Sequence, residues 1–188
     1  MRLLIQLSCD SHVTYDVYIS SVHSRPVHFS KMNFSFVIAA VEGFALQSGL
    51  VLRELTLIFP DGSEQHFHFK NPEHLYLTEV DAKTVKFSER YLNGFSAKHD
   101  GNSCLSNSIY PKILEEIESC RIYCAGESTR QFFARHLPYS TVIDVYSILD
   151  FKYPVELDNP HCFKLHRYRY CSLAKARFLK QRLQGFNL

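Results

Sequence analysis

Runs of apolar and β-branched residues predict a compact set of strands and helices that begins at Phe34. The run FSFVIAAVEGF predicts a buried strand that ends at Gly43. The segments LVLRELTLIF and EQHFHFK alternate polar and apolar residues, and the Pro60-Asp61-Gly62 turn between them is typical of a hairpin. The first half of the domain is therefore predicted to be an antiparallel meander.

Helical and strand patterns alternate in the second half of the chain. YPKILEE predicts a short helix, RIYCAG a strand, residues 128–136 a second helix and STVIDVYSIL a further strand. A polar, proline-bearing loop, FKYPVELDNPH, leads to a final helix in SLAKARFLKQRL, whose apolar face is Leu173, Ala176, Leu179 and Leu183. This order predicts an α/β fold in which the meander is followed by parallel strands and helices flank the mixed sheet.

A length of 188 residues suits a single domain. The pattern over residues 1–31 is weak, and Met32 stands just before the first convincing strand. We therefore expect residues 1–31 to be an N-terminal extension with little ordered structure, and residues 32–188 to form the domain.

Cysteine usage and the opening residues bear on the compartment. The first seven residues, MRLLIQL, form a run too short for a secretory signal or a membrane span, and six cysteines without a signal peptide do not indicate a disulfide framework. We expect an intracellular protein, cytoplasmic or nuclear, with no membrane partner. Its thiols are then available to bind metal or to pack in the core. Cys120 and Cys124 are predicted to be core thiols.

Charge is informative only near the C-terminus, because a net charge of +2 does not by itself indicate a nucleic-acid partner. From residue 164 onward every charged side chain is Lys or Arg, and two tyrosines alternate with two arginines. Such cations meet phosphates and such rings stack on bases in grooves for single strands. A solvated helix face is the alternative. The candidate nucleic-acid contacts are Lys164, Arg167, Tyr168, Arg169, Tyr170 and Lys175.

Three stretches resemble the DnaQ-like 3′–5′ exonucleases, which have the RNase H-like fold. They are the first strand, the pattern GFxxxxGxxxxELxxxxxDG that starts at Gly43, and a histidine, His166, before the last helix. The resemblance implies an RNase H-like sheet. It also implies acids on the first strand, in the middle of the chain and on the last helix, which hold two divalent cations for phosphodiester hydrolysis.

The chain departs from that family at its acids. Ala40-Val41-Glu42 stands where the family has Asp-x-Glu, and Cys171 stands where an Asp follows the histidine. The middle acid has no clear counterpart, and Asp100 and Asp144 are the nearest substitutes. No catalytic residue is assigned. Glu42, Asp100 and Asp144 are the candidates if cleavage persists, with Mg²⁺ or Mn²⁺ as the cofactor.

Cysteine and histidine residues, which are softer metal ligands than carboxylates, occur in the region where the family's acids are missing. Cys162, His166 and Cys171 form Cys-x3-His-x4-Cys in the region that the resemblance marks as the metal site. With Glu42, which the resemblance places opposite them, they are expected to complete a tetrahedral zinc shell. The set is similar to the Glu-Cys-His-Cys ligands of the Maelstrom domain, and His161 is an alternative ligand because domains in insect viral and mobile-element proteins have related zinc segments. Packing of the cysteines in the core is the competing interpretation. His66 and His68 are interpreted as an exposed strand face.

These features together predict a zinc-stabilised, catalytically degenerate exonuclease-like domain that binds single-stranded RNA or DNA, or a protein partner. We expect no enzymatic activity. One alternative is an active nuclease with an altered metal site, either a 3′–5′ exonuclease or an endonuclease for single-stranded RNA. The other is a pure protein-interaction module whose basic helix faces solvent.

Overall fold

The computed structural model describes residues 4–5, 15–16, 34–98, 104–149 and 171–185. The chain divides into two units, residues 1–32 and residues 33–188. In the first unit two short strands, β1 (Leu4–Ile5) and β2 (Tyr15–Asp16), pair in antiparallel orientation. The remaining helices and strands belong to the second unit.

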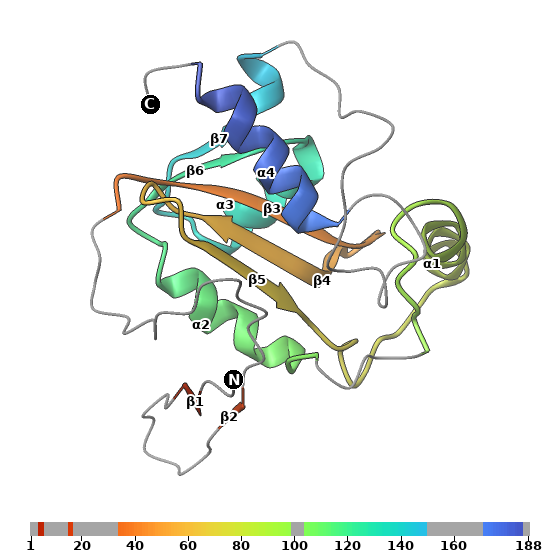
Figure 1. Cartoon of the computed structure of the whole chain (residues 1–188). Coiled ribbons are helices and arrows are strands. Elements are labelled where there is room, and N and C mark those ends of the chain that lie inside the picture. Colours follow the sequence, from red (N-terminus) through yellow and green to blue (C-terminus); the bar gives the residue numbers. More distant parts are fainter. Residues whose placement is uncertain (1–3, 6–14, 17–33, 99–103, 150–170, 186–188) are drawn as a thin grey trace. The chain divides into compact units, whose positions relative to one another are not determined.

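The second unit is built on a five-stranded mixed sheet with the strand order β5-β4-β3-β6-β7 (Figure 1). The meander β3, β4 and β5 is antiparallel, whereas β6 runs parallel to β3 and β7 runs parallel to β6. The predicted α/β class and mixed sheet are confirmed. The strand bounds are β3 Phe36–Leu46, β4 Gly49–Ile58, β5 Glu64–His68, β6 Arg121–Cys124 and β7 Val142–Asp144.

Among the residues that the structure describes, four α-helices flank the sheet, one short 3-10 turn leads into α2 and another follows β7. The first of them, α1, was not among the elements that the sequence pattern predicted. It begins after Thr78, whose hydroxyl accepts a hydrogen bond from the Asp81 amide, and it buries little apolar surface apart from Val85. The bounds are α1 Glu79–Tyr91, α2 Tyr110–Glu115, α3 Glu127–His136 and α4 Ser172–Leu183, with 3-10 turns at Asn107–Ile109 and Val145–Ser147.

The two faces of the sheet pack against different helices. Side chains of a strand alternate between its faces, so on the turn side of the bulge, up to Val41 of β3 and from Leu55 of β4, the odd-numbered residues face one core, which includes Leu114 of α2 and Phe133 of α3. Even-numbered residues such as Ile38 and Ala40 pack instead on Leu179 of α4. Figure 1 shows α4 lying along this second face. Polar side chains at even-numbered positions of β3, β4 and β5 are therefore brought to the first turns of α4.

Strand β3 does not end at Gly43, as the sequence predicted, but continues to Leu46. The register with β4 shifts between Glu42 and Gly43, which marks a β-bulge. A Cβ atom at Gly43 would lie 1.9 Å from the carbonyl oxygen of Val51. The glycine thus permits two backbones to approach each other inside the sheet, and it does not stop the strand.

Strand β7 is shorter than the STVIDVYSIL pattern predicted. It ends at Asp144, whose carboxylate accepts a hydrogen bond from the Tyr146 amide and starts a 3-10 turn. An aspartate that bonds to the backbone two residues ahead offers the chain a turn in place of the sheet ladder. The β-branched pattern of this segment therefore extends beyond the strand itself.

Candidate functional site

Glu42 and Lys175 meet where β3 faces the first turns of α4. The Lys175 ammonium donates a hydrogen bond to Oε1 of Glu42, and the two side chains are 23% and 12% exposed. On the same face of β3, Ala40 is buried against α4 and offers no ligand. The charge of Lys175, a predicted nucleic-acid contact, is thus compensated within the domain.

Cys171 caps the N-terminus of α4. Its Sγ atom accepts a hydrogen bond from the Ala174 amide at 3.4 Å, and the residue is 1% exposed. The other thiol and imidazole of the predicted zinc set, Cys162 and His166, lie outside the residues that the structure describes, as does His161. The Glu42, Cys162, His166 and Cys171 set therefore stays a prediction.

Asp144 and Cys124 lie at the ends of β7 and β6. Oδ1 of Asp144 accepts hydrogen bonds from the amides of Gly126 and Tyr146, both at 3.0 Å, so this carboxylate connects β7 to the start of α3.

Burial raises the pKa of Cys124 to about 12, and the nearby Asp144 charge acts in the same direction. Burial also raises the pKa of Cys120. Both cysteines are buried, which confirms the prediction of core thiols. Asp100 lies outside the described residues.

A cluster that the sequence interpretation missed lies on β4 and β5. Glu54 is completely buried, and its Oε1 lies 3.0 Å from Nδ1 of His68 and 3.7 Å from Nε2 of His66. The side chains of His66 and His68 are only 13% and 19% exposed, so the prediction of an exposed strand face is wrong. These three residues, here called the Glu-His-His cluster, could together hold a metal ion.

The first residue of α4 covers the cluster and is hydrogen-bonded to it. The Ser172 amide donates to Oε2 of Glu54 at 2.9 Å, and the Ser172 hydroxyl lies 2.7 Å from the Thr56 hydroxyl. Thr56 in turn is hydrogen-bonded to Nδ1 of His66 at 2.7 Å. These hydrogen bonds hold the N-terminus of α4 against the two histidines, and the helix therefore shields them from solvent.

One signal in the sequence could have revealed this cluster. The Pro60-Asp61-Gly62 turn closes the hairpin so that Glu54 stands opposite His68 and Thr56 opposite His66. Counting outward from the turn gives the same pairs, and even-numbered positions share one face. Alternation alone predicts each strand separately, and the pairs follow only when the two strands are aligned through the turn.

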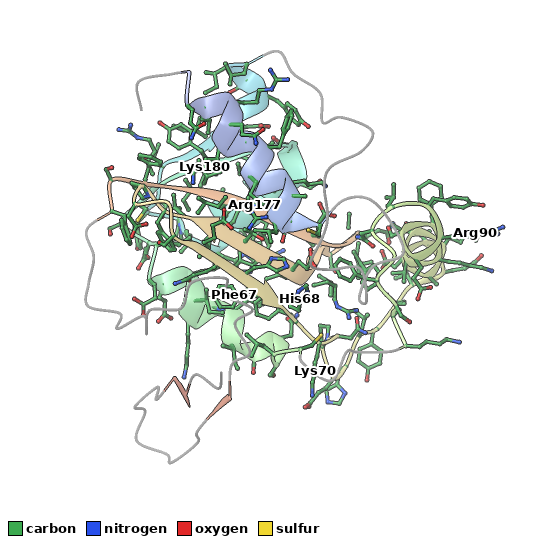
Figure 2. All side chains as sticks on the ribbon, in the orientation of Figure 1. Phe67, His68, Lys70, Arg90, Arg177 and Lys180 are labelled. Atoms are coloured by element: carbon green, nitrogen blue, oxygen red, sulfur yellow. The ribbon has the colours of Figure 1, made fainter. Side chains whose placement is uncertain are left out.

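Lys175, Arg177 and Lys180, three of the four basic side chains of α4, lie close to acids. Figure 2 shows Arg177 and Lys180 along this helix, and His68 on β5. The guanidinium of Arg177 donates to Oε2 of Glu64 at 2.7 Å. The pKa of Asp61 is lowered mainly by its hydrogen bonds to Ser63, with a smaller contribution from the charge of Lys180. The other predicted nucleic-acid contacts, Lys164, Arg167, Tyr168, Arg169 and Tyr170, lie outside the described residues.

Comparisons of the chain with protein-family models, with curated proteins and with solved structures find no match. Within the part of the chain that the structure describes, no helix has both the length and the apolar character needed to cross a bilayer. The function is therefore inferred from the residues and contacts described above.

Proposed function

We propose that residues 32–188 form an RNase H-like domain that has lost two-metal catalysis and binds single-stranded nucleic acid. The sheet order β5-β4-β3-β6-β7, with an antiparallel meander followed by two parallel strands, supports an RNase H-like topology. The position of α4 against β3 supports it as well, because the acids of DnaQ-like exonucleases lie on the first strand and the last helix. Fold and site thus favour the same family.

The contact between Lys175 and Glu42 carries the proposal. In a two-metal nuclease, carboxylates at this place hold divalent cations that activate water and stabilise the leaving oxygen. Here the one remaining acid of the first strand holds an ammonium group, and its neighbour two positions earlier is Ala40. A divalent cation at Glu42 would have to displace Lys175 or bind beside a like charge. The lysine therefore fills the role of a cation without supplying a reactive water.

Zinc remains part of this proposal through the predicted set of Glu42, Cys162, His166 and Cys171, and an ion bound there would have to take the place of the Lys175 ammonium at Glu42. Two thiolates, one imidazole and one carboxylate would close a structural site and leave no position for a catalytic water. Such an ion stabilises the domain without contributing to cleavage. Substituting Cys162→Ser is expected to lower the bound zinc and the stability of the full chain, as measured by elemental analysis and thermal unfolding.

A cleavage assay tests the loss of catalysis. The full chain, incubated with single-stranded RNA or DNA oligonucleotides and Mg²⁺ or Mn²⁺, is expected to give no product above a protein-free control. The physical reason is that the domain lacks the carboxylates needed to hold two divalent cations. Cleavage by the wild-type protein that disappears in Glu42→Gln would overturn the proposal and favour an active nuclease instead.

Nucleic-acid binding is supported by the basic and aromatic segment that precedes α4. The double substitution Arg167→Glu and Arg169→Glu is expected to weaken binding of a fluorescent single-stranded oligonucleotide. Loss of two phosphate contacts should also reduce the slope of log K against log salt by about 1.4, at about 0.7 per contact. Fluorescence anisotropy over a range of salt concentrations measures both effects.

The matched control reverses two exposed lysines on other helices, Lys86→Glu and Lys112→Glu. This variant has the same change in net charge, and it is expected to keep most of the affinity. If both double variants bind equally well, the segment before α4 is not the contact surface, and a protein-interaction module becomes the better account.

A further inference from the structure

We propose that the Glu-His-His cluster binds a zinc ion through Glu54, His66 and His68. None of these residues belongs to the predicted zinc set, although Glu54 is part of the GFxxxxGxxxxELxxxxxDG pattern and stands opposite Glu42 in the register of β3 and β4. The site does not require the proposed function, and it would exist even if the domain bound no nucleic acid.

The hairpin of β4 and β5 preorganises the ligands. Glu54 and His68 are direct partners in the antiparallel register, and His66 stands opposite Thr56, one pair closer to the turn. Partners in such a register have Cβ atoms roughly 5 Å apart, so a carboxylate and an imidazole can point to one common atom. Because a strand pair is rigid, little conformational entropy is lost when an ion joins its side chains.

The distances between ligand atoms agree with a single ion. Oε1 of Glu54 lies 3.0 Å from Nδ1 of His68 and 3.7 Å from Nε2 of His66. All three ligand atoms lie within 4.8 Å of one another. Two ligands of a tetrahedral zinc, each about 2.05 Å from the metal, are about 3.3 Å apart. Small shifts of the side chains would thus bring the three atoms to coordination distance.

Hydrogen bonds around the cluster orient the ligand atoms. If zinc binds Nε2 of His66, Nδ1 of the same ring carries the proton and donates a hydrogen bond to the Thr56 hydroxyl, 2.7 Å away. Oε2 of Glu54 accepts the Ser172 amide, so Oε1 is the oxygen that faces the two imidazoles. Metal-bound histidines and carboxylates are usually held by such outer contacts, which fix the tautomer and the direction of the lone pair.

The buried charge also favours a cation at this place. A carboxylate that is completely out of solvent, as Glu54 is, is costly to ionise without a nearby positive charge. A protonated imidazole could supply one positive charge. A zinc ion supplies two, and it is coordinated by the lone pairs of the imidazole nitrogens. Two nitrogens and one oxygen suit zinc, whereas Mg²⁺ and Ca²⁺ prefer shells of oxygen.

Metal titration of the full chain tests the site. After chelation, the wild-type protein is titrated with zinc in competition with a chromogenic chelator. The variants Glu54→Gln, His66→Ala and His68→Ala are each expected to raise the dissociation constant of this site by at least about 100-fold. Removing a residue that binds the metal directly should cost at least as much affinity as removing an outer hydrogen-bond partner. The matched controls are the exposed Glu73→Gln and His74→Ala. Wild-type affinity in all three cluster variants would overturn the proposal.

A second measurement does not depend on the folding of any variant of the cluster. The wild-type protein loaded with ¹¹³Cd²⁺ is expected to show a ¹¹³Cd resonance in the range of nitrogen and oxygen ligands, and this resonance should persist in Cys162→Ser. The predicted Glu42, Cys162, His166 and Cys171 set would instead give a resonance in the thiolate range. Absence of any resonance from nitrogen and oxygen ligands would overturn the cluster site, whatever happens at the thiolate set.

Discussion

Replacing Arg53 by methionine is expected to lower the free energy of unfolding by about 3 to 5 kcal/mol, because several hydrogen bonds to one buried charged group are lost together. Arg53 lies on β4 and is 3% exposed. Its Nε donates to the carbonyl oxygen of Phe69 at 2.9 Å, and its Nη1 donates to that of Ser96 at 2.8 Å and to Oδ1 of Asn71 at 2.6 Å. Methionine would leave these acceptors without their charged donor, and such bonds to a charged group are among the stronger ones.

Chemical denaturation followed by circular dichroism measures this loss. The matched control is Arg121→Met on β6, where the side chain is exposed and a change below about 0.5 kcal/mol is expected. The guanidinium of Arg53 also lies over the rings of Phe44 and Phe95, 5.7 and 5.4 Å from their centroids. If Arg53→Met and Arg121→Met were equally mild, the attachment of the segment around Ser96 to the sheet would be contradicted.

Substituting Gly43→Ala is expected to destabilise the domain by about 3 kcal/mol. The added Cβ would meet the Val51 carbonyl oxygen at 1.9 Å and the Arg53 backbone nitrogen at 3.2 Å, and both atoms belong to the paired strand. Backbone atoms inside a sheet cannot move aside as the tip of a flexible side chain can. The bulge that follows Glu42 would have to rearrange.

Thermal and denaturant unfolding of Gly43→Ala measure this loss of stability. Gly185→Ala, after the end of α4, is the control because a Cβ there meets no atom within 4 Å. Equal stabilities of the two variants would contradict the close approach of β3 and β4 at Gly43. The same experiment separates this steric role of glycine from its general conformational freedom, which both positions lose.

The sequence was sufficient for those elements whose apolar pattern is local. The β4–β5 hairpin follows from alternation around Pro60-Asp61-Gly62, and the last helix follows from the spacing of its leucines. Helix α1 could not be predicted in this way, because it is anchored by few apolar contacts such as Val85 and by the Thr78 cap. Gly43 was interpreted as a strand end for a related reason, since the contact that requires it is with another strand.

The candidate site depends on contacts between distant parts of the chain. Ser172 meets Glu54, and Lys175 meets Glu42, across 118 and 133 residues. Hydrophobic periodicity does not report such pairs, because the residues are polar and each looks like an ordinary surface position in its own segment. The pairings of Glu54 with His68 and of Thr56 with His66 could be obtained from local sequence, by counting through the hairpin turn.

Two polar features on the α4 face support the proposed loss of two-metal catalysis. Lys175 provides the positive charge at Glu42, and the Glu-His-His cluster offers nitrogen-rich ligands one and two strands away. Hard cations in pairs need several carboxylates. On this face Glu42 and Glu54 stand opposite each other in the β3–β4 register, but Glu42 is paired with Lys175 and Glu54 lies with two imidazoles. A soft or borderline ion is the better match to the ligands present.

Anomalous diffraction from crystals of the full chain soaked in MnCl₂ tests the replacement of the cation by Lys175 most directly. The account predicts no manganese peak at Glu42, with the Lys175 ammonium against its carboxylate. A pair of manganese ions about 4 Å apart, bound through Glu42 with Lys175 displaced, would contradict it.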